Sequence, residues 1–336
     1  MNLELREVGK GIFATNRAVM QAEVADAVIF DMDGVLIDVH SSYPMVICQA
    51  VTHYLKEVGF KGESLACTPQ QTAYFKAAGG FNNDWALAQG MALVFLVRAV
   101  MAGSQDYSLL QKTSPDILTL SHAIAQQGGG LRGLGRALEG LVDEKDFEMI
   151  SRQWDKERIT RLAMEYYAGD ECPQIFGIHN DTVKGAGFMT HERPLVSRED
   201  LLKTPFRYGL YTGRNRGETQ AAMRNADLDG LWDDEAMITE DRGIHKPDPA
   251  GLTEIAKTLS PRLMIYAGDN LDDWQAQARY EAERSLDDPP CLFCGILGGS
   301  PGPLAYSLFL DRGVDFMAQS VRQLLNWLTF RRQYTG

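Results

Sequence analysis

The chain has 336 residues, of which 45% are hydrophobic and 23% are charged, and its formal net charge is −12 at pH 7. This composition is ordinary for a folded globular protein, and the length favours two domains over one. The negative charge, with no run of lysine or arginine to offset it, argues against nucleic acid or an anionic membrane as a partner. Five scattered cysteines do not indicate a disulfide framework, and the charged N-terminus lacks the apolar core of a secretion signal. We therefore expect a cytoplasmic protein.

The first strong pattern lies at residues 27–40, AVIFDMDGVLIDVH. Its apolar run at 27–30 is long enough for a buried strand and too short for a helix. The run ends at Asp31 and Asp33, and Gly34 permits a sharp turn that keeps both acids at the carboxyl end of the strand. Open α/β sheets bind ligands at that end. Two carboxylates held so close repel each other unless a cation or a shared proton neutralises them, and Mg²⁺ prefers such oxygen ligands.

Residues 1–26 precede this strand and are expected to pack on an edge of the sheet. After the strand, apolar residues recur at three- and four-residue spacing from Tyr43 to Val58, which predicts an amphipathic helix ending at Gly59. The chain then reads as mostly helical to about Arg198. Further helices are predicted near residues 69–78, 85–102, 116–127, 133–142 and 145–168.

The predicted helix at 85–102 is apolar almost all round. It contains Gln89 and Arg98, however, and its apolar stretch is shorter than the about 20 residues that a membrane span needs. We therefore expect a helix buried in a protein core, and no membrane partner.

The loop before that helix has two interpretations. Gly79-Gly80 ends the preceding helix, and Asn82, Asn83 and Asp84 are residue types that cap the start of a helix. Capping is the first interpretation, and contact of the loop with a ligand is the second. Another glycine-rich stretch, GGGLRG at 128–133, has the spacing of a dinucleotide-binding loop but no strand before it. We interpret it as a loop between helices.

Two later apolar runs also end abruptly at polar residues. The run at 206–211 is followed by Thr212-Gly213-Arg214, and the run at 263–267 leads into GDNLDD, which contains Asp269 and Asp273. Both runs are predicted to be strands. The two acids are four residues apart, so they can share one face of a turn that opens a helix.

Lys246 lies between these two strands, in the sequence HKPDP. The two prolines predict a stiff, extended turn that fixes the lysine. Helices are predicted at 217–225 and from Pro249 to about Leu259. Near the C-terminus we expect a buried strand at 291–297, whose two cysteines are structural, and an amphipathic helix at 314–328.

In order along the chain, FDMDGVLID, TGR, HKPDP and GDNLDD resemble the four motifs of the haloacid dehalogenase-like superfamily. The long helical segment lies where members with a helical cap carry it, between the first and second motifs. The resemblance implies a catalytic core formed by residues 1–39 and 204–336, and a mostly helical cap domain at 40–203. The alternation of strands and helices independently indicates an α/β fold with a doubly wound, parallel, Rossmann-like sheet.

The resemblance also implies roles for the residues of the first two motifs. Asp31 would be the nucleophile that forms an aspartyl-phosphate, and Asp33 would be the general acid and then the general base. Thr212 and the adjacent backbone N–H would bind a phosphate oxygen. Gly213 would permit close backbone approach, and Arg214 would add positive charge.

The other motifs would supply charge neutralisation and the metal site. Lys246 would neutralise the nucleophile and the phosphate, and Asn83 would contact the substrate away from its phosphate. Asp273 would support the metal directly or through water. The expected Mg²⁺ ligands are Asp31, Asp33, Asp269 and Asp273.

These implications predict a Mg²⁺-dependent phosphatase that acts on a small phosphorylated metabolite. Two alternatives stay open: a phosphomutase resembling β-phosphoglucomutase, and a non-catalytic protein that binds a phosphorylated metabolite. A dehalogenase is disfavoured, because that chemistry does not use Asp33 as a leaving-group acid. The sequence leaves monomer and homodimer equally open.

Overall fold

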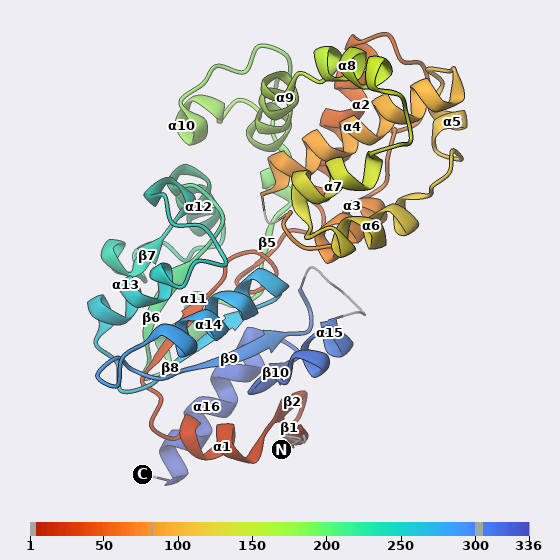
Figure 1. Ribbon diagram of the computed structural model, residues 1–336. Coiled ribbons are helices and arrows are strands. Elements are labelled where there is room, and N and C mark those ends of the chain that lie inside the picture. The colour runs from red at the N-terminus through yellow and green to blue at the C-terminus, as the bar shows by residue number, and fades with distance from the viewer. Residues whose placement is uncertain (1–4, 82, 300–304, 336) are drawn as a thin grey trace. The chain divides into compact units, whose positions relative to one another are not determined.

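The structure is a computed structural model that describes residues 5–81, 83–299 and 305–335 (Figure 1). It divides into two compact units. The core unit consists of Met1–Val39 and Glu192–Gly336, and the helical unit consists of His40–His191.

The segment at 192–203 belongs to the core unit, whereas the sequence analysis assigned it to the helical domain. Two contacts within the core unit explain this difference. Strand β5 (Arg193–Pro194) pairs with β4 (Ile37–Asp38) in a small antiparallel sheet. Helix α11 (Arg198–Leu202) contacts the C-terminal helix α16 (Val321–Thr335).

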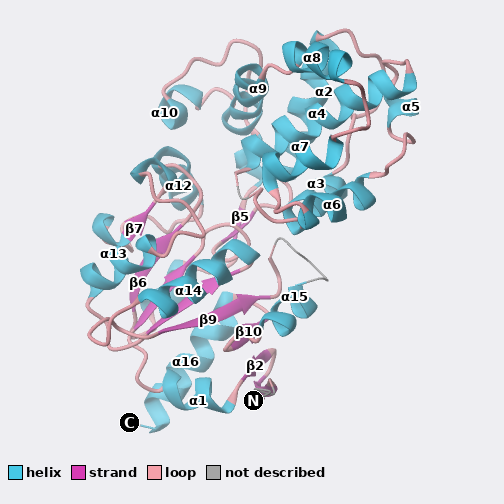
Figure 2. Ribbon diagram, viewed as in Figure 1, coloured by secondary structure: helices cyan, strands magenta, loops and turns pink. Residues whose placement is uncertain are grey.

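The main sheet of the core unit has eight strands in the described part of the chain, in the order β1-β2-β10-β9-β8-β3-β6-β7 (Figure 2). The strands from β10 to β7 are parallel, while β1 and β2 form an antiparallel hairpin at the edge beside β10. This confirms the predicted α/β fold and the packing of the N-terminal residues on a sheet edge. The strands are β1 (Arg6–Gly9), β2 (Ile12–Ala14), β3 (Ala27–Phe30), β6 (Arg207–Tyr211), β7 (Met237–Ile238), β8 (Met264–Gly268), β9 (Cys291–Ile296) and β10 (Phe316–Ala318).

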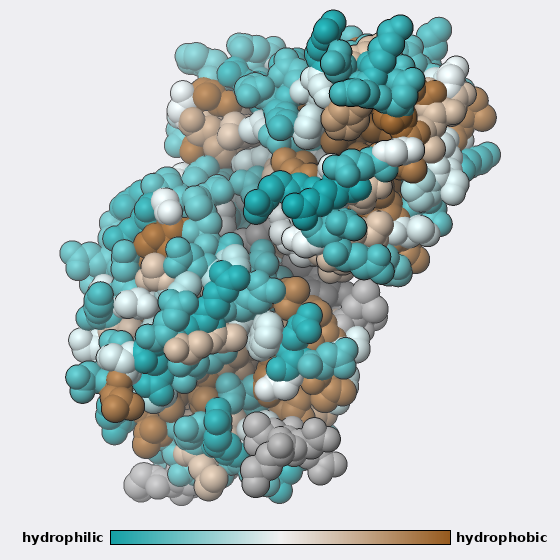
Figure 3. Space-filling view, viewed as in Figure 1, coloured by the Kyte–Doolittle hydropathy of each residue, from teal (hydrophilic) through white to brown (hydrophobic). Residues whose placement is uncertain are grey.

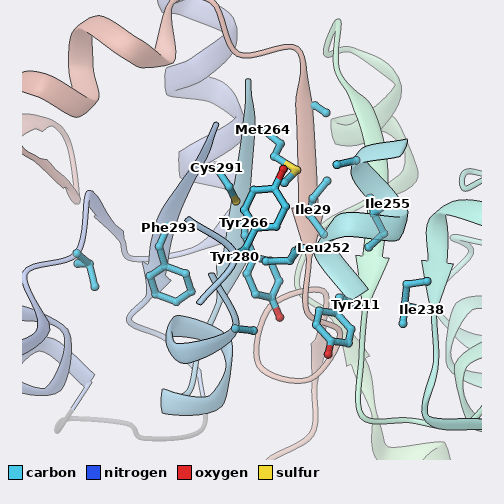
Figure 4. Packing of buried hydrophobic residues seen from close by; sticks show 14 of the residues in the cluster. Ile29, Tyr211, Ile238, Leu252, Ile255, Met264, Tyr266, Tyr280, Cys291 and Phe293 are labelled. Atoms are coloured by element: carbon cyan, nitrogen blue, oxygen red, sulfur yellow. The ribbon is translucent and has the colours of Figure 1, made fainter. Parts of the chain in front are cut away.

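Strand β3 lies in the parallel part of the sheet, between β6 and β8, and all its residues are fully buried. Successive side chains alternate between the two faces of a sheet. Ile29 packs in a hydrophobic cluster that includes Tyr266 and residues of α13 and α14 (Figure 4). Phe30 instead contacts the rings of Tyr208 and Trp232. Burial on both faces explains why this strand is a continuous apolar run.

Helices complete the layers of the core unit on both faces of the sheet. Helices α13 and α14 contact β6, β8 and β9, and α16 contacts β2 and β10. The remaining elements of the unit are α1 (Asn16–Ala22), α12 (Arg216–Asn225), η2 (Asp234–Ala236), η3 (Glu240–Arg242), α13 (Ala250–Leu259), α14 (Leu271–Glu283) and α15 (Ala305–Arg312).

The prediction of one helix at 314–328 is wrong in its first part. Strand β10 occupies Phe316–Ala318, and α16 begins at Val321. All three residues of β10 are fully buried between β2 and β9. The predicted strand at 291–297 is confirmed by β9, and the chain's five cysteines are free and buried.

The helical unit confirms the mostly helical character predicted for this segment. The region at 145–168 was predicted as one helix, but it forms two, because Asp155 caps the start of the second by accepting a hydrogen bond from the Arg158 backbone N–H. Its elements are α2 (Tyr43–Glu57), α3 (Pro69–Ala77), α4 (Asp84–Ala102), α5 (Tyr107–Leu110), α6 (Ile117–Gln126), α7 (Gly130–Leu138), α8 (Glu144–Gln153), α9 (Lys156–Ala168), α10 (Cys172–Phe176) and η1 (Phe188–His191).

Helix α4 is, among the described residues, the one helix long and apolar enough to cross a membrane. It contacts α2, α7 and α9, and 67% of its apolar window is buried. The buried Arg98 donates hydrogen bonds to the carbonyls of Leu110 and Pro115. On the face drawn in Figure 3, hydrophilic residues cover most of the surface. These contacts are typical of the core helix of a globular unit.

The two glycine-rich stretches of the helical unit pack against each other. The Gly130 N–H donates to the Gly79 carbonyl at 2.9 Å. A Cβ on Gly80 would lie 2.7 Å from the Gly130 nitrogen, and a Cβ on Gly129 would lie 2.4 Å from the Gly79 oxygen. Close backbone approach therefore explains the first glycines of GGGLRG. The interpretation as a loop between helices holds for Gly128 and Gly129, whereas residues 130–133 begin helix α7.

Candidate active site

Three neighbouring parallel strands end together at one edge of the main sheet. Asp31 follows β3, Thr212 follows β6 and Asp269 follows β8. Their register is fixed by pairing of Phe30 with both Ala267 and Leu210. The carboxyl ends of these parallel strands therefore place the residues of three sequence motifs side by side.

A buried carboxylate cluster lies at this edge. One oxygen of each of Asp31, Asp269 and Asp273 lies within 4.8 Å of the others, and the three residues are at most 4% exposed. The Lys246 ammonium lies 2.7 Å from Asp31 Oδ1 and 2.6 Å from Asp273 Oδ1. The ammonium thus pairs with two of the three clustered carboxylates, which leaves an excess of negative charge that a metal cation fits.

The cluster perturbs the acidity of its members. Burial raises the pKa of Asp31 well above its usual range, Asp273 raises it further, and Lys246 acts in the opposite direction. Burial alone would lower the pKa of Lys246, but Asp273 and Asp31 outweigh burial and raise it. Lys246 is therefore a permanent cation, whereas Asp31 requires more positive charge than Lys246 supplies in order to ionise readily.

Asp273 is held from several directions. Its Oδ1 accepts a hydrogen bond from the Tyr266 hydroxyl at 2.6 Å, and its Oδ2 accepts from the backbone N–H groups of Asp269 and Asn270 at 3.1 and 3.2 Å. Asn270 in turn caps α14. Asp273 therefore fixes both Lys246 and the turn that carries Asp269. The adjacent Asp272 is half-buried, and burial, followed by repulsion from Asp273, raises its pKa to about 6.

Gly34 makes room for the cluster. Its φ is +72°, and a Cβ built on it would lie 2.0 Å from Asp269 Oδ2. Any larger residue would therefore clash with this carboxylate and would also strain the turn.

Asp33 lies outside the three-carboxylate cluster and pairs with Arg214. Its Oδ1 accepts hydrogen bonds from Arg214 Nε at 2.8 Å and Arg214 Nη2 at 2.6 Å. Arg214 also binds both carboxylate oxygens of Glu192, at 3.0 and 3.1 Å. The structure thus places the arginine of the second motif on two acids. Its expected contribution to phosphate binding stays a prediction, as does metal ligation by Asp33.

Thr212 is buried, and its hydroxyl accepts a hydrogen bond from the Arg214 backbone N–H at 3.2 Å. Its own N–H donates to the Ile238 carbonyl at 3.0 Å. These bonds fix the Thr212-Gly213-Arg214 turn at the end of β6. The turn thereby lies next to the carboxylate cluster in the sheet order.

Asn83 belongs to the helical unit and caps α4. Its side-chain oxygen accepts a hydrogen bond from the Ala86 N–H at 3.0 Å, and the Lys76 ammonium lies 2.9 Å from Asp84 Oδ1. The capping interpretation is therefore confirmed for Asn83, and substrate contact by this residue stays a prediction. Asn82, named with it, lies outside the described residues.

Sequence patterns missed two residues of this site. Tyr266 lies within the apolar run of β8, where an aromatic residue reads as core packing, yet its hydroxyl binds Asp273. Glu192 is far from every motif along the chain and precedes a two-residue strand. No local signal in the sequence pointed to either residue, because β8 is buried throughout and Glu192 lies outside the motifs.

Comparison with known proteins bears on the fold. No family model matches the sequence, and no curated protein matches it. Among solved structures, the phosphatase Tt82 from Thermococcus thioreducens is similar with 21% identity and a TM-score of 0.50, covering 79% of this chain and 91% of that one. A Northeast Structural Genomics Consortium target is similar with 14% identity and a TM-score of 0.56, covering 90% and 98%.

The similarity to these two structures extends over both units of the chain. At sequence identities this low, the similarity establishes the fold alone. The sheet order, the helical insertion after the first parallel strand, and the acidic residues at the strand ends agree with it. The chain therefore shares the fold of these two structures, which is a Rossmann-like α/β core with an inserted helical domain, and this agrees with the resemblance of its motifs to the haloacid dehalogenase-like superfamily.

Proposed function

We propose that this protein is a Mg²⁺-dependent phosphatase that hydrolyses a small phosphorylated metabolite through an aspartyl-phosphate. The observation that carries the proposal is the buried cluster of Asp31, Asp269 and Asp273 around Lys246 at the carboxyl end of β3. Such a cluster is costly for a purely structural role, because three buried acids lie together and Lys246 pairs with two of them.

The carboxylate set fits Mg²⁺, which prefers hard oxygen ligands and leaves positions for phosphate. Asp31 and Asp269 are the proposed ligands, and Asp273 supports them. When bound, the ion offsets the repulsion between the nucleophile and the incoming phosphate and favours the ionised form of Asp31.

Asp31 Oδ1 is engaged by Lys246 and by the Met32 N–H at 2.7 Å. We assign the attack on phosphorus to Oδ2. The new Asp31–phosphorus bond forms as the bond to the leaving oxygen breaks, and Asp33 donates a proton to that oxygen. Asp33 then accepts a proton from the water that attacks the aspartyl-phosphate, which releases phosphate and restores Asp31. The Thr212 hydroxyl and the Lys246 ammonium bind the phosphate oxygens in both steps.

A phosphomutase is the second candidate, since the same residues would return the phosphoryl group to a sugar instead of to water. A non-catalytic protein is less consistent with the site, because every motif residue of both chemical steps is present and placed at one sheet edge. We propose a small phosphorylated substrate as the partner, and neither nucleic acid nor a membrane. The proposed location is the cytoplasm.

The direct experiment is a panel of phosphorylated metabolites assayed for phosphate release with Mg²⁺ and with EDTA. We expect release that requires the metal and disappears in Asp31→Asn. Conversion of one sugar phosphate to another without phosphate release would favour the mutase. If neither reaction occurs and a bound metabolite is recovered intact, the result would favour a non-catalytic binding protein.

Substrate contact by Asn83 is a separate proposal, tested by Asn83→Ala. Loss of the cap should cost about 1 kcal/mol of stability whether or not the residue touches substrate. A substrate contact would in addition lower kcat/KM for the metabolite more than for a small aryl phosphate.

A further inference from the structure

Arg214 joins Asp33 to a second acid that no motif contains. Its side chain is 1% exposed, and the Glu192 side chain is 3% exposed. The guanidinium binds Glu192 with two nitrogens, Nη1 to Oε2 at 3.1 Å and Nη2 to Oε1 at 3.0 Å. This two-point contact fixes the plane of the guanidinium, because a planar fork and a planar carboxylate match in one orientation.

The backbone of Arg214 is fixed as well. Its N–H donates to the Thr212 hydroxyl, and its carbonyl accepts from the Glu240 N–H at 2.9 Å. With both ends held, the remaining edge of the guanidinium, Nε and Nη2, meets Asp33 Oδ1. Asp33 is 23% exposed and more accessible than its partners. Arg214 therefore holds Asp33 Oδ1 in place, and we assign the transferred proton to the other oxygen, Oδ2.

Backbone pairing links Glu192 to the Asp33 turn by a second route. The Gly34 N–H donates to the Ile37 carbonyl at 2.8 Å, and Ile37 pairs with Pro194, two residues beyond Glu192. Glu192 is also the first residue of the core unit after the helical insertion. The returning chain thus brings its own carboxylate to the arginine that holds Asp33.

We propose that Glu192 is a positioning residue, which acts through Arg214 to orient the carboxyl of Asp33 toward the leaving oxygen. This inference rests on the proposed function, in which Asp33 donates the proton. A correctly oriented acid matters for an alkyl phosphate, whose leaving alcohol is a poor leaving group. It matters little for p-nitrophenyl phosphate, whose leaving phenolate needs no proton.

The test compares kcat/KM of Glu192→Gln on these two substrates. We expect kcat/KM for the alkyl phosphate to fall by about 100-fold, the lower range of general-acid catalysis, and that for p-nitrophenyl phosphate to fall by less than about threefold. The control is Asp26→Asn, at the opposite end of β3, because Asp26 also binds two arginines, Arg207 and Arg262. It should lower the melting temperature and leave the ratio of the two substrates unchanged.

Equal losses on both substrates in Glu192→Gln, or no loss on either, would overturn the positioning role and leave the proposed function intact. A wild-type protein that hydrolyses neither substrate would instead refute the proposed function, and the inference with it. If Glu192→Gln does not fold, Glu192→Asp carries the same comparison, because it keeps the charge and shortens the reach to Arg214. A substrate ratio unchanged in Glu192→Asp would count against the inference.

Discussion

Lys246 is the residue whose removal should perturb both stability and activity most. Its ammonium is buried, and it contacts Asp31 and Asp273 at 2.7 and 2.6 Å. In Lys246→Met the side chain keeps much of its volume, but two carboxylates lose their shared cation. Removing one partner of a buried ion pair costs about 3–5 kcal/mol, because the remaining charge stays buried without compensation. For a unit of this size that corresponds to a fall in Tm of about 6–20 °C.

In the same variant kcat should fall by at least about 100-fold, because enzymes lose this much when a group that stabilises charge in the transition state is removed. Thermal unfolding by circular dichroism and phosphate release on one preparation measure both effects. The matched control is Lys257→Met, on the exposed side of α13, which should change the free energy of unfolding by about 0.5 kcal/mol or less. A Lys246→Met protein that melts and turns over like wild type would refute the assigned charge arrangement.

Four further predictions concern the acids and the turn that holds them. With p-nitrophenyl phosphate, whose leaving group needs no proton, Asp33→Asn should slow hydrolysis of the aspartyl-phosphate more than its formation, so that acid-quenched enzyme contains more covalent phosphate than wild type; less would contradict the base role. The folded pKa of Asp31 is raised above its unfolded value of about 4, so metal-free stability should fall as pH rises through the interval between them. Bound Mg²⁺ favours the ionised carboxylate, so its gain in Tm should be larger at pH 8 than at pH 5, and an equal gain would argue against ligation by Asp31. Gly34→Ala should abolish that gain because its Cβ meets Asp269, whereas Gly243→Ala, with φ +76° and open space around its Cβ, should keep it.

Most of the core site was predictable from the sequence because each element carries a local signal. Strand β3 is buried on both faces, so it reads as a continuous apolar run, and the run stops where the acids begin. The same logic located β6 and β8. Their parallel register then brings Asp31, Thr212 and Asp269 to one edge without any further information.

What the sequence could not provide depends on contacts between distant segments. Glu192 and Arg214 meet only in the folded core, so neither spacing nor periodicity marks their pairing. Strand β10 has three residues, and its apolar side chains also satisfy a helical pattern; pairing with β2 and β9 decides its conformation. The glycines of GGGLRG match a nucleotide-binding pattern, although their actual constraint is the backbone of Gly79-Gly80.

The central claim is that Asp31 becomes covalently phosphorylated during turnover. Rapid acid quench of the enzyme with p-nitrophenyl phosphate labelled on its phosphoryl group, followed by proteolysis and mass spectrometry, tests it directly. The account predicts label on the peptide that contains Asp31 in wild type, more of it in Asp33→Asn, and none in Asp31→Asn. Turnover of the labelled substrate with no label on Asp31 in either wild type or Asp33→Asn would contradict it.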